Sequence, residues 1–225
     1  MTRVLVLRPE PGASATVERA RQRGLEAIAL PLFEIEPVIW NAPEASGFDG
    51  LLLTSANAVR FGGDQLKDLR GLPVYAVGPS TAEAAREAGF DIASTGGAGV
   101  DRLLGSIDPE LKLLHLAGED RREPDDAKQQ IQVVPVYRSK AHDNVHVRPA
   151  EGCVAMVHSA RAAERFGELV NSSGIDRMTI AIAAISPDAA SAAGEGWAAV
   201  EATDEPNDDA LLALTERLCN KVRAT

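Results

Sequence analysis

The chain is poor in cysteine and histidine. Its two cysteines, Cys153 and Cys219, lie far apart in the sequence and form no CxxC pair. This spacing excludes a disulfide framework and a thiolate metal site, and it predicts two free, buried thiols. His142 and His146 are four residues apart, but no convincing third ligand accompanies them, so the sequence predicts no metal site there.

Long hydrophobic runs are also absent. No apolar stretch approaches the roughly 20 residues that a membrane-spanning helix needs. The opening residues, from Met1 to Leu7, have the pattern of a strand and not of a signal peptide. We therefore expect a cytoplasmic protein without a membrane partner.

Positive charge is in deficit. The chain contains 23 Lys and Arg against 33 Asp and Glu, which gives a formal net charge of −10 at pH 7. Such a surface repels polyanions at long range, which argues against nucleic acid as a partner. An anionic small molecule is still compatible with this charge, because local donors in a cleft decide such binding.

What the chain does contain is a pattern that nearly repeats itself. The serines Ser55 and Ser159 mark the offset, which is 159 − 55 = 104 residues. Four pairs of segments carry the repeat: 53–61 and 157–166, 77–82 and 185–190, 30–33 and 134–137, and more faintly 95–104 and 203–212. Because the echoes keep the same order, they predict two similar lobes with a cleft between them.

Short runs rich in Val, Ile and Leu alternate with helical segments along the chain. The expected strands are residues 4–7, 27–32, 51–54, 74–77, 92–94, 113–116, 133–137, 154–157, 180–185 and 198–201. Continuous apolar strands that alternate with helices are typical of parallel sheets covered on both faces. The sequence therefore predicts an α/β fold with two doubly wound parallel sheets.

The expected lobes are not sequential along the chain. The weakest patterns occur at about 34–48 and 138–152, and each stretch follows the second strand of its half. We infer that residues 1–36 and 142–225 form one lobe and that residues 38–140 form the other. The two weak stretches would then be linkers that cross as antiparallel segments and form a hinge.

Helices are expected at residues 14–23, 80–88 and 207–222. Gly24 and Gly89 follow the first two as natural C′ residues. Ser80 and Glu83 have the spacing of a capping box at the start of the second helix. Ser186 is followed by a proline, which places proline at a first helical position.

Strand-to-helix turns are the expected place for chemistry. Ligands of open parallel sheets bind beyond the carboxyl ends of the strands, near helix N-termini whose N–H groups accept anions. Four turns have suitable small residues: 8–14, 55–57, 78–81 and 159–162. Alternatively, the four serines at these and similar turns are ordinary N-caps, each stabilising its helix by about 1 kcal/mol: Ser55, Ser80, Ser159 and Ser186.

Five motifs, in order along nearly the whole chain, carry a resemblance to a known family. They are LVLRP at 5–9, LPLFEIEP at 30–37, DGLLLTSANAV at 49–59, AVGPSTA at 76–82 and PVYR at 135–138. The series resembles the uroporphyrinogen-III synthase family. The resemblance implies two flavodoxin-like lobes, a two-stranded linker, a monomer, and neither metal nor organic cofactor. It also implies cyclisation of hydroxymethylbilane to uroporphyrinogen III, with loss of water and inversion of ring D.

The resemblance also implies site residues. Tyr137 matches the family's functionally important tyrosine, whose phenol can donate a proton as the substrate hydroxyl leaves as water. Phe33, its repeat counterpart, lacks a hydroxyl. The expected substrate-binding residues are Arg8, Ser55, Ala56, Asn57, Gly78, Thr81, Arg138, Ser159 and Ala160, with Arg60 and Arg161 as further arginines near the cleft. The alternative is an ordinary strand tyrosine and solvated surface arginines.

One turn departs from the family pattern. Ser-Pro-Asp-Ala at residues 186–189 stands where the family usually has a Gly-Pro-Thr-like turn, and Asp188 would place negative charge near a polyanion. Two other functions therefore stay open. One is a tetrapyrrole-binding or regulatory module that kept the fold and lost turnover, and the other is an unrelated two-lobed sensor of small molecules.

Overall fold

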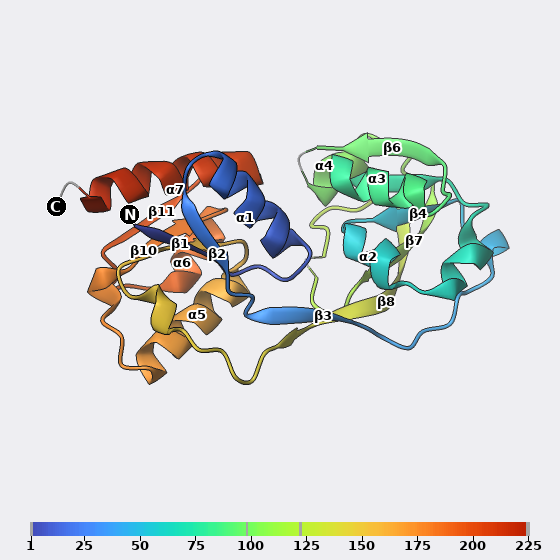
Figure 1. Cartoon of the computed structure of the whole chain (residues 1–225). Helices are drawn as coiled ribbons and strands as arrows, with labels where there is room; N and C mark the ends of the chain where they lie inside the picture. The colour runs from blue at the N-terminus through green and yellow to red at the C-terminus, as the bar shows by residue number, and fades with distance from the viewer. Residues whose placement is uncertain (1, 98, 122, 224–225) are drawn as a thin grey trace. The chain divides into compact units, whose positions relative to one another are not determined.

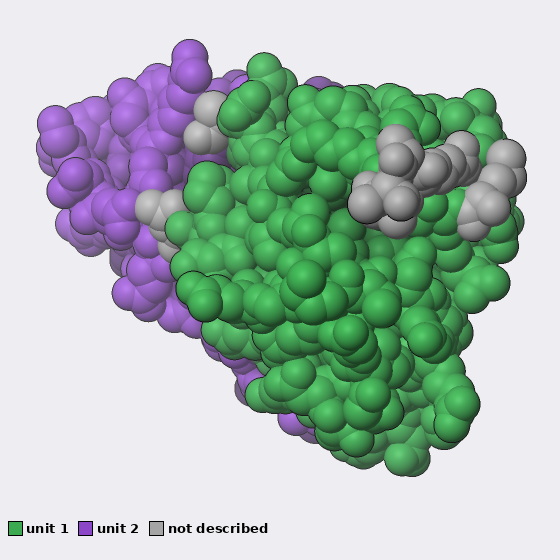
Figure 2. Space-filling view, turned by 90° about the vertical axis from the view of Figure 1, so that its left-hand side faces the viewer, with its two compact units in different colours: residues 1–34, 141–225 green, residues 35–140 purple. Residues whose placement is uncertain are grey.

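The chain forms two compact units, the first of which consists of two separate stretches of sequence. The computed structural model describes residues 2–97, 99–121 and 123–223, so Met1 of the expected first strand lies outside the described residues. Unit 1 comprises residues 1–34 and 141–225, and unit 2 comprises residues 35–140 (Figure 2).

Unit 1 is built on a five-stranded parallel sheet with the order β11-β10-β9-β1-β2 (Figure 1). Its strands are β1 (Arg3–Val6), β2 (Glu26–Ala29), β9 (Val154–Val157), β10 (Ala181–Ala184) and β11 (Ala199–Ala202). Its helices are α1 (Gly12–Gln22), α5 (Ala160–Ser172), α6 (Pro187–Ala193) and α7 (Asp208–Arg223).

Both faces of this sheet are covered because successive side chains of a strand point to opposite faces. Val4 and Val6 pack into one core with α1 and α7, whereas Leu5 and Leu7 pack into another with α5 and α6. The inner residues of β1 are therefore apolar on both sides, whereas Arg3 at its start is exposed. Among the described residues, none of the helices has both the length and the apolar character that crossing a bilayer demands.

Unit 2 contains most of a six-stranded sheet with the order β3-β8-β7-β4-β5-β6. Its strands are β3 (Phe33–Pro37), β4 (Gly50–Leu53), β5 (Val74–Val77), β6 (Ile92–Gly96), β7 (Lys112–Gly118) and β8 (Gln130–Ala141). Its α-helices are α2 (Ala56–Phe61), α3 (Pro79–Glu87) and α4 (Val100–Leu104). Leu51 and Leu53 face the core under α2 and α3, and Leu52 faces the core under α4.

Strand β3 pairs with β8 in the opposite direction from the other strands (Figure 1). The backbone N–H of Val38 donates to the carbonyl of Val136 at 3.0 Å, and that of His142 donates to the carbonyl of Leu32 at 3.0 Å. Residue numbers therefore rise along one strand as they fall along the other, which is antiparallel pairing.

All ten expected strands overlap an observed strand, and an eleventh strand, β3, lies outside the ten apolar runs. Strand β3 (Phe33–Pro37) overlaps the stretch 34–48, which was expected to be one of two antiparallel linker segments. Strand β8 is also longer than expected, because it continues beyond Tyr137 to Ala141 while it pairs with β3.

Three of the four expected serine caps are confirmed. The hydroxyls of Ser55, Ser159 and Ser186 accept from backbone N–H groups of α2, α5 and α6. The capping box at Ser80 is wrong. Helix α3 begins one residue earlier, at Pro79, and its N-cap is Gly78, with φ of 86°, two residues before Ser80; Glu83 pairs with Arg86 at 3.2 Å instead.

The two cysteines are free and buried, as expected. Burial raises the pKa of the Cys153 thiol to about 12, because the interior disfavours the thiolate. The thiol is therefore protonated at neutral pH and is a poor nucleophile.

Unit 2 also buries a polar pair between two neighbouring strands. His115 of β7 is 2% exposed, and its Nε2 lies 3.0 Å from the hydroxyl of Thr54, which follows β4. Burial lowers the pKa of His115 to about 4, and the positive charge of Arg121 contributes to the shift. The imidazole is therefore neutral at pH 7.

We predict that His115 makes folding sensitive to acid. Its pKa falls from 6.5 to about 4 on folding, so the unfolded chain binds more protons between these values. Stability is fully present above pH 6.5 and decreases towards pH 4, by about 3 kcal/mol for this group. Urea unfolding at several pH values should show a flatter decrease for His115→Gln than for the exposed control His146→Gln. Equal slopes in both variants would contradict the prediction.

Candidate functional site

The carboxyl edge of the unit 2 sheet gathers most of the expected site residues of that unit. Ser55 follows β4, Gly78 follows β5, and Gly118 ends β7. Tyr137 pairs in register with Gly118, so it lies at the same edge although β8 continues beyond it. Because parallel strands end at one edge, residues far apart in sequence meet there.

The turn after β4 presents backbone donors. Ser55 is the N-cap of α2, and its hydroxyl accepts from the N–H of Asn57 at 3.2 Å. Ala56 is buried and Asn57 is half-buried. The first N–H groups of a helix have no partner within the helix, so this turn can donate to an anion.

The turn after β5 depends on a glycine. Gly78 has a φ of 86°, which L side chains rarely adopt, and a Cβ there would meet no atom within 4 Å. Its N–H donates to the carbonyl of Gly96 at 2.7 Å, which fixes the turn to β6. Thr81, in the first turn of α3, is only 3% exposed, so the structure does not present its hydroxyl at the surface.

Tyr137 packs against Gly118 at the end of β7. A Cβ on Gly118 would come within 2.8 Å of Cε2 and 2.9 Å of Cζ of the tyrosine ring. The ring is half-buried against the core that contains Leu51 and Leu53. The absence of a side chain at Gly118 is therefore what allows the phenol its present position.

Arg138 is held away from its neighbour Tyr137. Its guanidinium binds Glu36 of β3, with Nε at 3.0 Å and Nη2 at 2.8 Å from Oε2, and Lys140 approaches Oε1 at 3.1 Å. These hydrogen bonds lower the pKa of Glu36. Successive residues of a strand point to opposite faces, so Arg138 and Tyr137 cannot act on one side of β8 together.

In unit 1 the turn after β9 resembles the turn after β4. Ser159 is the exposed N-cap of α5, and its hydroxyl accepts from the N–H of Ala162 at 3.2 Å. Ala160 is half-buried. Arg161 is exposed and stacks over the ring of Phe33, with Cζ 4.9 Å from the ring centroid. Arg60, on α2 of unit 2, is also exposed.

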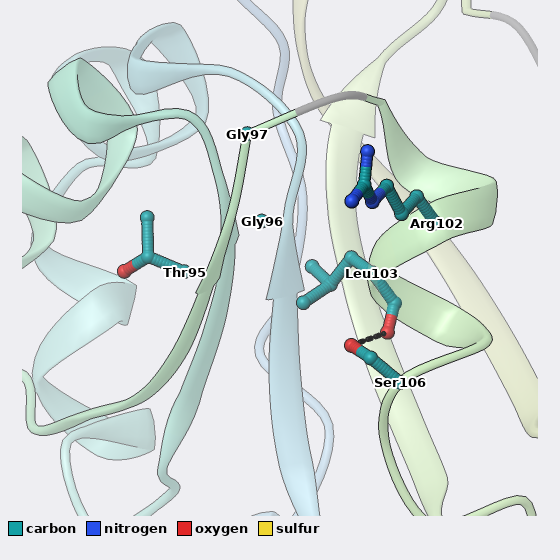
Figure 3. A pocket seen from close by; sticks show the side chains of 6 residues that line it. All are labelled: Thr95, Gly96, Gly97, Arg102, Leu103 and Ser106. Atoms are coloured by element: carbon teal, nitrogen blue, oxygen red, sulfur yellow. Dashed lines mark hydrogen bonds between the residues drawn. The ribbon is translucent and has the colours of Figure 1, made fainter.

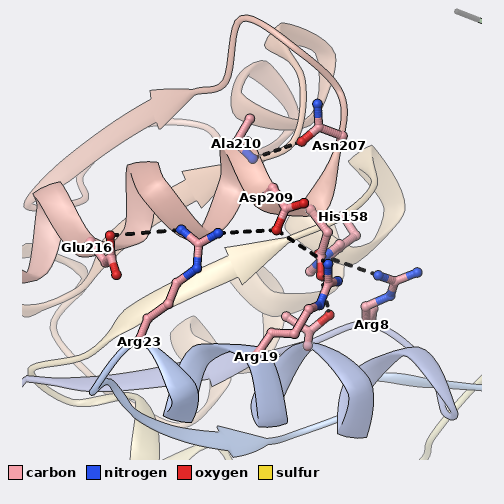
Figure 4. Close-up of polar contacts among 10 residues, drawn as sticks. Arg8, Arg19, Arg23, His158, Asn207, Asp209, Ala210 and Glu216 are labelled. Carbon is pink, nitrogen blue, oxygen red and sulfur yellow. Dashed lines mark hydrogen bonds and ion pairs between the residues drawn. The ribbon is translucent and has the colours of Figure 1, made fainter. Parts of the chain in front are cut away.

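A polar cluster lies beside this turn (Figure 4). Asp208, the first residue of α7, accepts from the hydroxyl of Thr16 at 2.8 Å and from the guanidinium of Arg19. Its carboxylate also lies 2.7 Å from His158 Nε2 and 3.5 Å from Arg8 Nη1. Of the expected site residues, only Arg8 belongs to this cluster.

His158 is a neutral member of this cluster. Burial lowers its pKa to about 3, and the positive charge of Arg8 acts in the same direction. Since the Asp208 carboxylate only accepts, the ring proton must be on Nε2 and point at it.

The sequence contained a signal for this cluster that was missed. His158 stands where the repeat has Thr54, and Asp208 stands where it has Val100, since 208 − 108 = 100 with the offset 203 − 95 = 108. These two departures from the repeat mark the residues whose roles differ between the units.

A separate cavity of about 400 Å³ lies at the carboxyl end of β6, next to α4 (Figure 3). The hydroxyl of Ser106 donates to the carbonyl of Leu103 at 2.7 Å beside it. Its lining residues are Thr95, Gly96, Gly97, Arg102, Leu103 and Ser106. None of the expected site residues lines this cavity. In the part of the chain that the structure describes, no three His, Cys, Asp or Glu residues are grouped to hold a metal ion.

Two relatives resemble parts of the chain. A uroporphyrinogen-III synthase of Chlorobaculum parvum is 37% identical over 101 residues, which cover 41% of this chain and 41% of that protein. A porphyrin biosynthesis protein HemD of Ruminiclostridium josui is 31% identical over 102 residues, which cover 40% of this chain and 20% of that protein. The matches thus span less than half the length of each relative.

Solved structures and a family model extend the likeness to nearly the whole chain. A uroporphyrinogen-III synthetase from Helicobacter pylori has a TM-score of 0.67 at 18% identity, covering 97% of this chain and all of that one. A mutant uroporphyrinogen III synthase from Thermus thermophilus has a TM-score of 0.54 at 18% identity, with 98% of this chain covered and all of that one. Both share its mixed α/β fold with parallel sheets. A family model described as uroporphyrinogen-III synthase HemD matches residues 14–213, and the chain therefore belongs to the uroporphyrinogen-III synthase family.

Proposed function

We propose that this protein is a uroporphyrinogen-III synthase, which cyclises hydroxymethylbilane to uroporphyrinogen III with loss of water and inversion of ring D. The observation that carries the proposal is the family match over residues 14–213. The substrate is a polycarboxylate, so backbone donors at the strand ends are suited to bind it. The protein would act as a cytoplasmic monomer without a metal or organic cofactor, and without membrane or nucleic-acid partners.

We further propose that the two units are copies of one flavodoxin-like lobe, joined by a two-stranded linker. The sheet orders support this, because β2-β1-β9-β10-β11 in unit 1 corresponds to β8-β7-β4-β5-β6 in unit 2. The order along the chain differs between the units. The first strand of this set in unit 2 is β4, which corresponds to β9, the third strand of the set in unit 1. The lobes would be residues 1–36 with 142–225, and residues 38–140, with β3 and β8 in the linker.

The chemical task of such an enzyme is to select one ring closure. The open tetrapyrrole closes unaided to isomer I. Binding must therefore favour a closure in which the substituted carbon of the terminal ring is the attacking atom, which gives a spirocyclic intermediate. Holding the reacting atoms in that geometry supplies most of the rate. The donors at Ser55, Ala56, Asn57 and Gly78 in unit 2, and at Ser159 and Ala160 in unit 1, are proposed to bind the substrate carboxylates.

Arginines and Thr81 complete the proposed site. Arg8 would pair with a substrate carboxylate from unit 1. Arg138 would have to exchange Glu36 for substrate, which makes it the weaker candidate of the two arginines. Thr81 would need a local rearrangement before its buried hydroxyl could donate.

Tyr137 is proposed as the general acid. The C–O bond of the substrate's hydroxymethyl group breaks, the phenol gives a proton to the departing oxygen, and water leaves as the new carbon–carbon bond forms. The close packing of the ring on Gly118 supports this role, because a positioned acid is more effective than a mobile one.

A second candidate is a tetrapyrrole-binding or regulatory module of the same fold without turnover. The changed turn at residues 186–189 favours it, since Asp188 is exposed there. An acid in the first turn of α6 also stabilises that helix, which gives Asp188 a purely structural explanation.

We predict that the protein directs ring closure to isomer III. A hydroxymethylbilane-producing enzyme should be coupled to the purified chain, and the product isomers should be separated by chromatography after oxidation. We expect mostly isomer III with the protein and isomer I without it. Isomer I alone in both reactions would reject the enzymatic function and favour the binding module.

Removal of the Tyr137 hydroxyl should slow the reaction. We expect Tyr137→Phe to lower kcat by about 100-fold or more, because a positioned general acid typically contributes that much. The second tyrosine of the chain provides the control, and Tyr75→Phe should keep kcat within about twofold. A near-normal kcat for Tyr137→Phe would remove this residue from the mechanism and leave the synthase function intact.

Displacement of the Tyr137 ring should also slow the reaction. An alanine at position 118 would force the ring to move, and we expect Gly118→Ala to lower kcat by about 10-fold to about 100-fold. Gly47→Ala is the matched control, since a Cβ there meets no atom within 4 Å. Equal activity of the two variants would show that the ring position does not matter.

A further inference from the structure

Asp208 connects segments that are distant in the sequence. It lies in the first turn of α7, while Thr16 and Arg19 are on α1 and His158 follows β9. Its carboxylate contacts all three of these side chains, and its own side chain is 12% exposed. One largely buried carboxylate therefore fixes how α1, α7 and the turn at Ser159 meet at the carboxyl edge of unit 1.

The same carboxylate also orients Arg8. Arg8 Nη1 lies 3.5 Å from Asp208 Oδ1. On its other side the guanidinium lies over Gly12, where a Cβ would come within 2.5 Å of Nε and 2.8 Å of Cζ. The position of Arg8 thus depends on a carboxylate beside it and on a missing side chain beneath it.

Charge explains why this arrangement needs an acid. Arg8 and Arg19 both contact Asp208, so two guanidinium groups lie close together. A histidine carries no negative charge in either protonation state, so His158 cannot offset their repulsion, whereas the Asp208 carboxylate can. Without that carboxylate, Arg8 would be expected to turn away from Arg19.

The other unit builds its corresponding edge without this acid. In the repeat, Thr54 and Val100 stand at the positions of His158 and Asp208, and Thr54 contacts the neutral His115 instead. The fold of a unit therefore does not require a carboxylate at this position. This difference points to a role that belongs to unit 1 alone.

We propose that Asp208 is a positioning residue that holds Arg8 at the carboxyl edge of unit 1, oriented to pair with a carboxylate of the substrate. The inference rests on the proposed function, because it assumes a polycarboxylate ligand. A guanidinium has five N–H donors in a planar fork, so a carboxylate at one terminal nitrogen can orient the group while it binds a second anion.

The test compares Asp208→Asn and Gly12→Ala with wild type in the coupled isomer assay. We expect both variants to displace Arg8, one by removing the acid and the other by filling the space beneath the guanidinium. We expect each to raise KM for hydroxymethylbilane by about tenfold, the usual effect of losing one charged hydrogen bond, with kcat within about twofold and isomer III still formed. The difference in KM from wild type should shrink at high salt, because screening weakens the pairing that the variants lose.

Asp209→Asn is the matched control. Asp209 is the next residue on α7 and contacts Arg19 and Arg23, but its side chain is 72% exposed. We expect its KM to equal that of wild type. If Asp208→Asn fails to fold, Gly12→Ala carries the test, because only the end of the Arg8 side chain must move.

The outcomes separate the two proposals. Wild type that forms isomer III, with an unchanged KM in Gly12→Ala and in any folded Asp208→Asn, would overturn the role of Asp208 and leave the synthase function standing. A lower melting temperature without a change in KM would also overturn it, since that result indicates a purely structural role. Wild type that forms only isomer I would reject the synthase function and this inference together.

Discussion

The rest of the structure depends on strands that are apolar on both sides. In β1, Val4 and Val6 enter one core while Leu5 and Leu7 enter another, so helices must cover both faces of the sheet. In β4 the same division separates Leu52 from its neighbours. Where central strands such as β4 and β9 are buried on both faces, a ligand can reach them at their carboxyl ends, where the chain turns into helices. The burial of the strands thereby decides where chemistry can take place.

The same property made much of the fold predictable. Ten strands were found from continuous apolar runs, because a strand buried on both faces leaves that trace in the sequence. Strand β3 left no continuous apolar run, because Phe33–Pro37 alternates apolar and charged residues, ends in proline, and pairs on one side only, with β8; its stretch was expected only as an antiparallel linker segment. The start of α3 was misplaced because the Ser80–Glu83 spacing is a local pattern, whereas a glycine with positive φ already turned the chain at Gly78.

The candidate site was predictable where it consists of backbone. Small residues after strands revealed the turns at Ser55, Gly78 and Ser159, because caps and tight turns require such residues. Contacts between distant side chains left no local pattern, and only the departures of His158 and Asp208 from the repeat hinted at their cluster. Asp208 meets partners from α1 and β9, and Tyr137 rests on Gly118 of another strand, so only the folded chain brings them together. The resemblance to a family identified Tyr137, but nothing local explained its position.

The interrupted course of unit 1 has a consequence for synthesis on the ribosome. Its sheet places β1 between β2 and β9, and β9 begins at Val154, after the whole of unit 2 has been made. The second unit can therefore complete its own sheet while the earlier segment still lacks a strand on one side. During that interval the edge of β1 that will later pair with β9 is unpaired, so the apolar residues Val4 to Leu7 are not yet enclosed. A growing chain of this design has an apolar segment that chaperones can bind until β9 emerges.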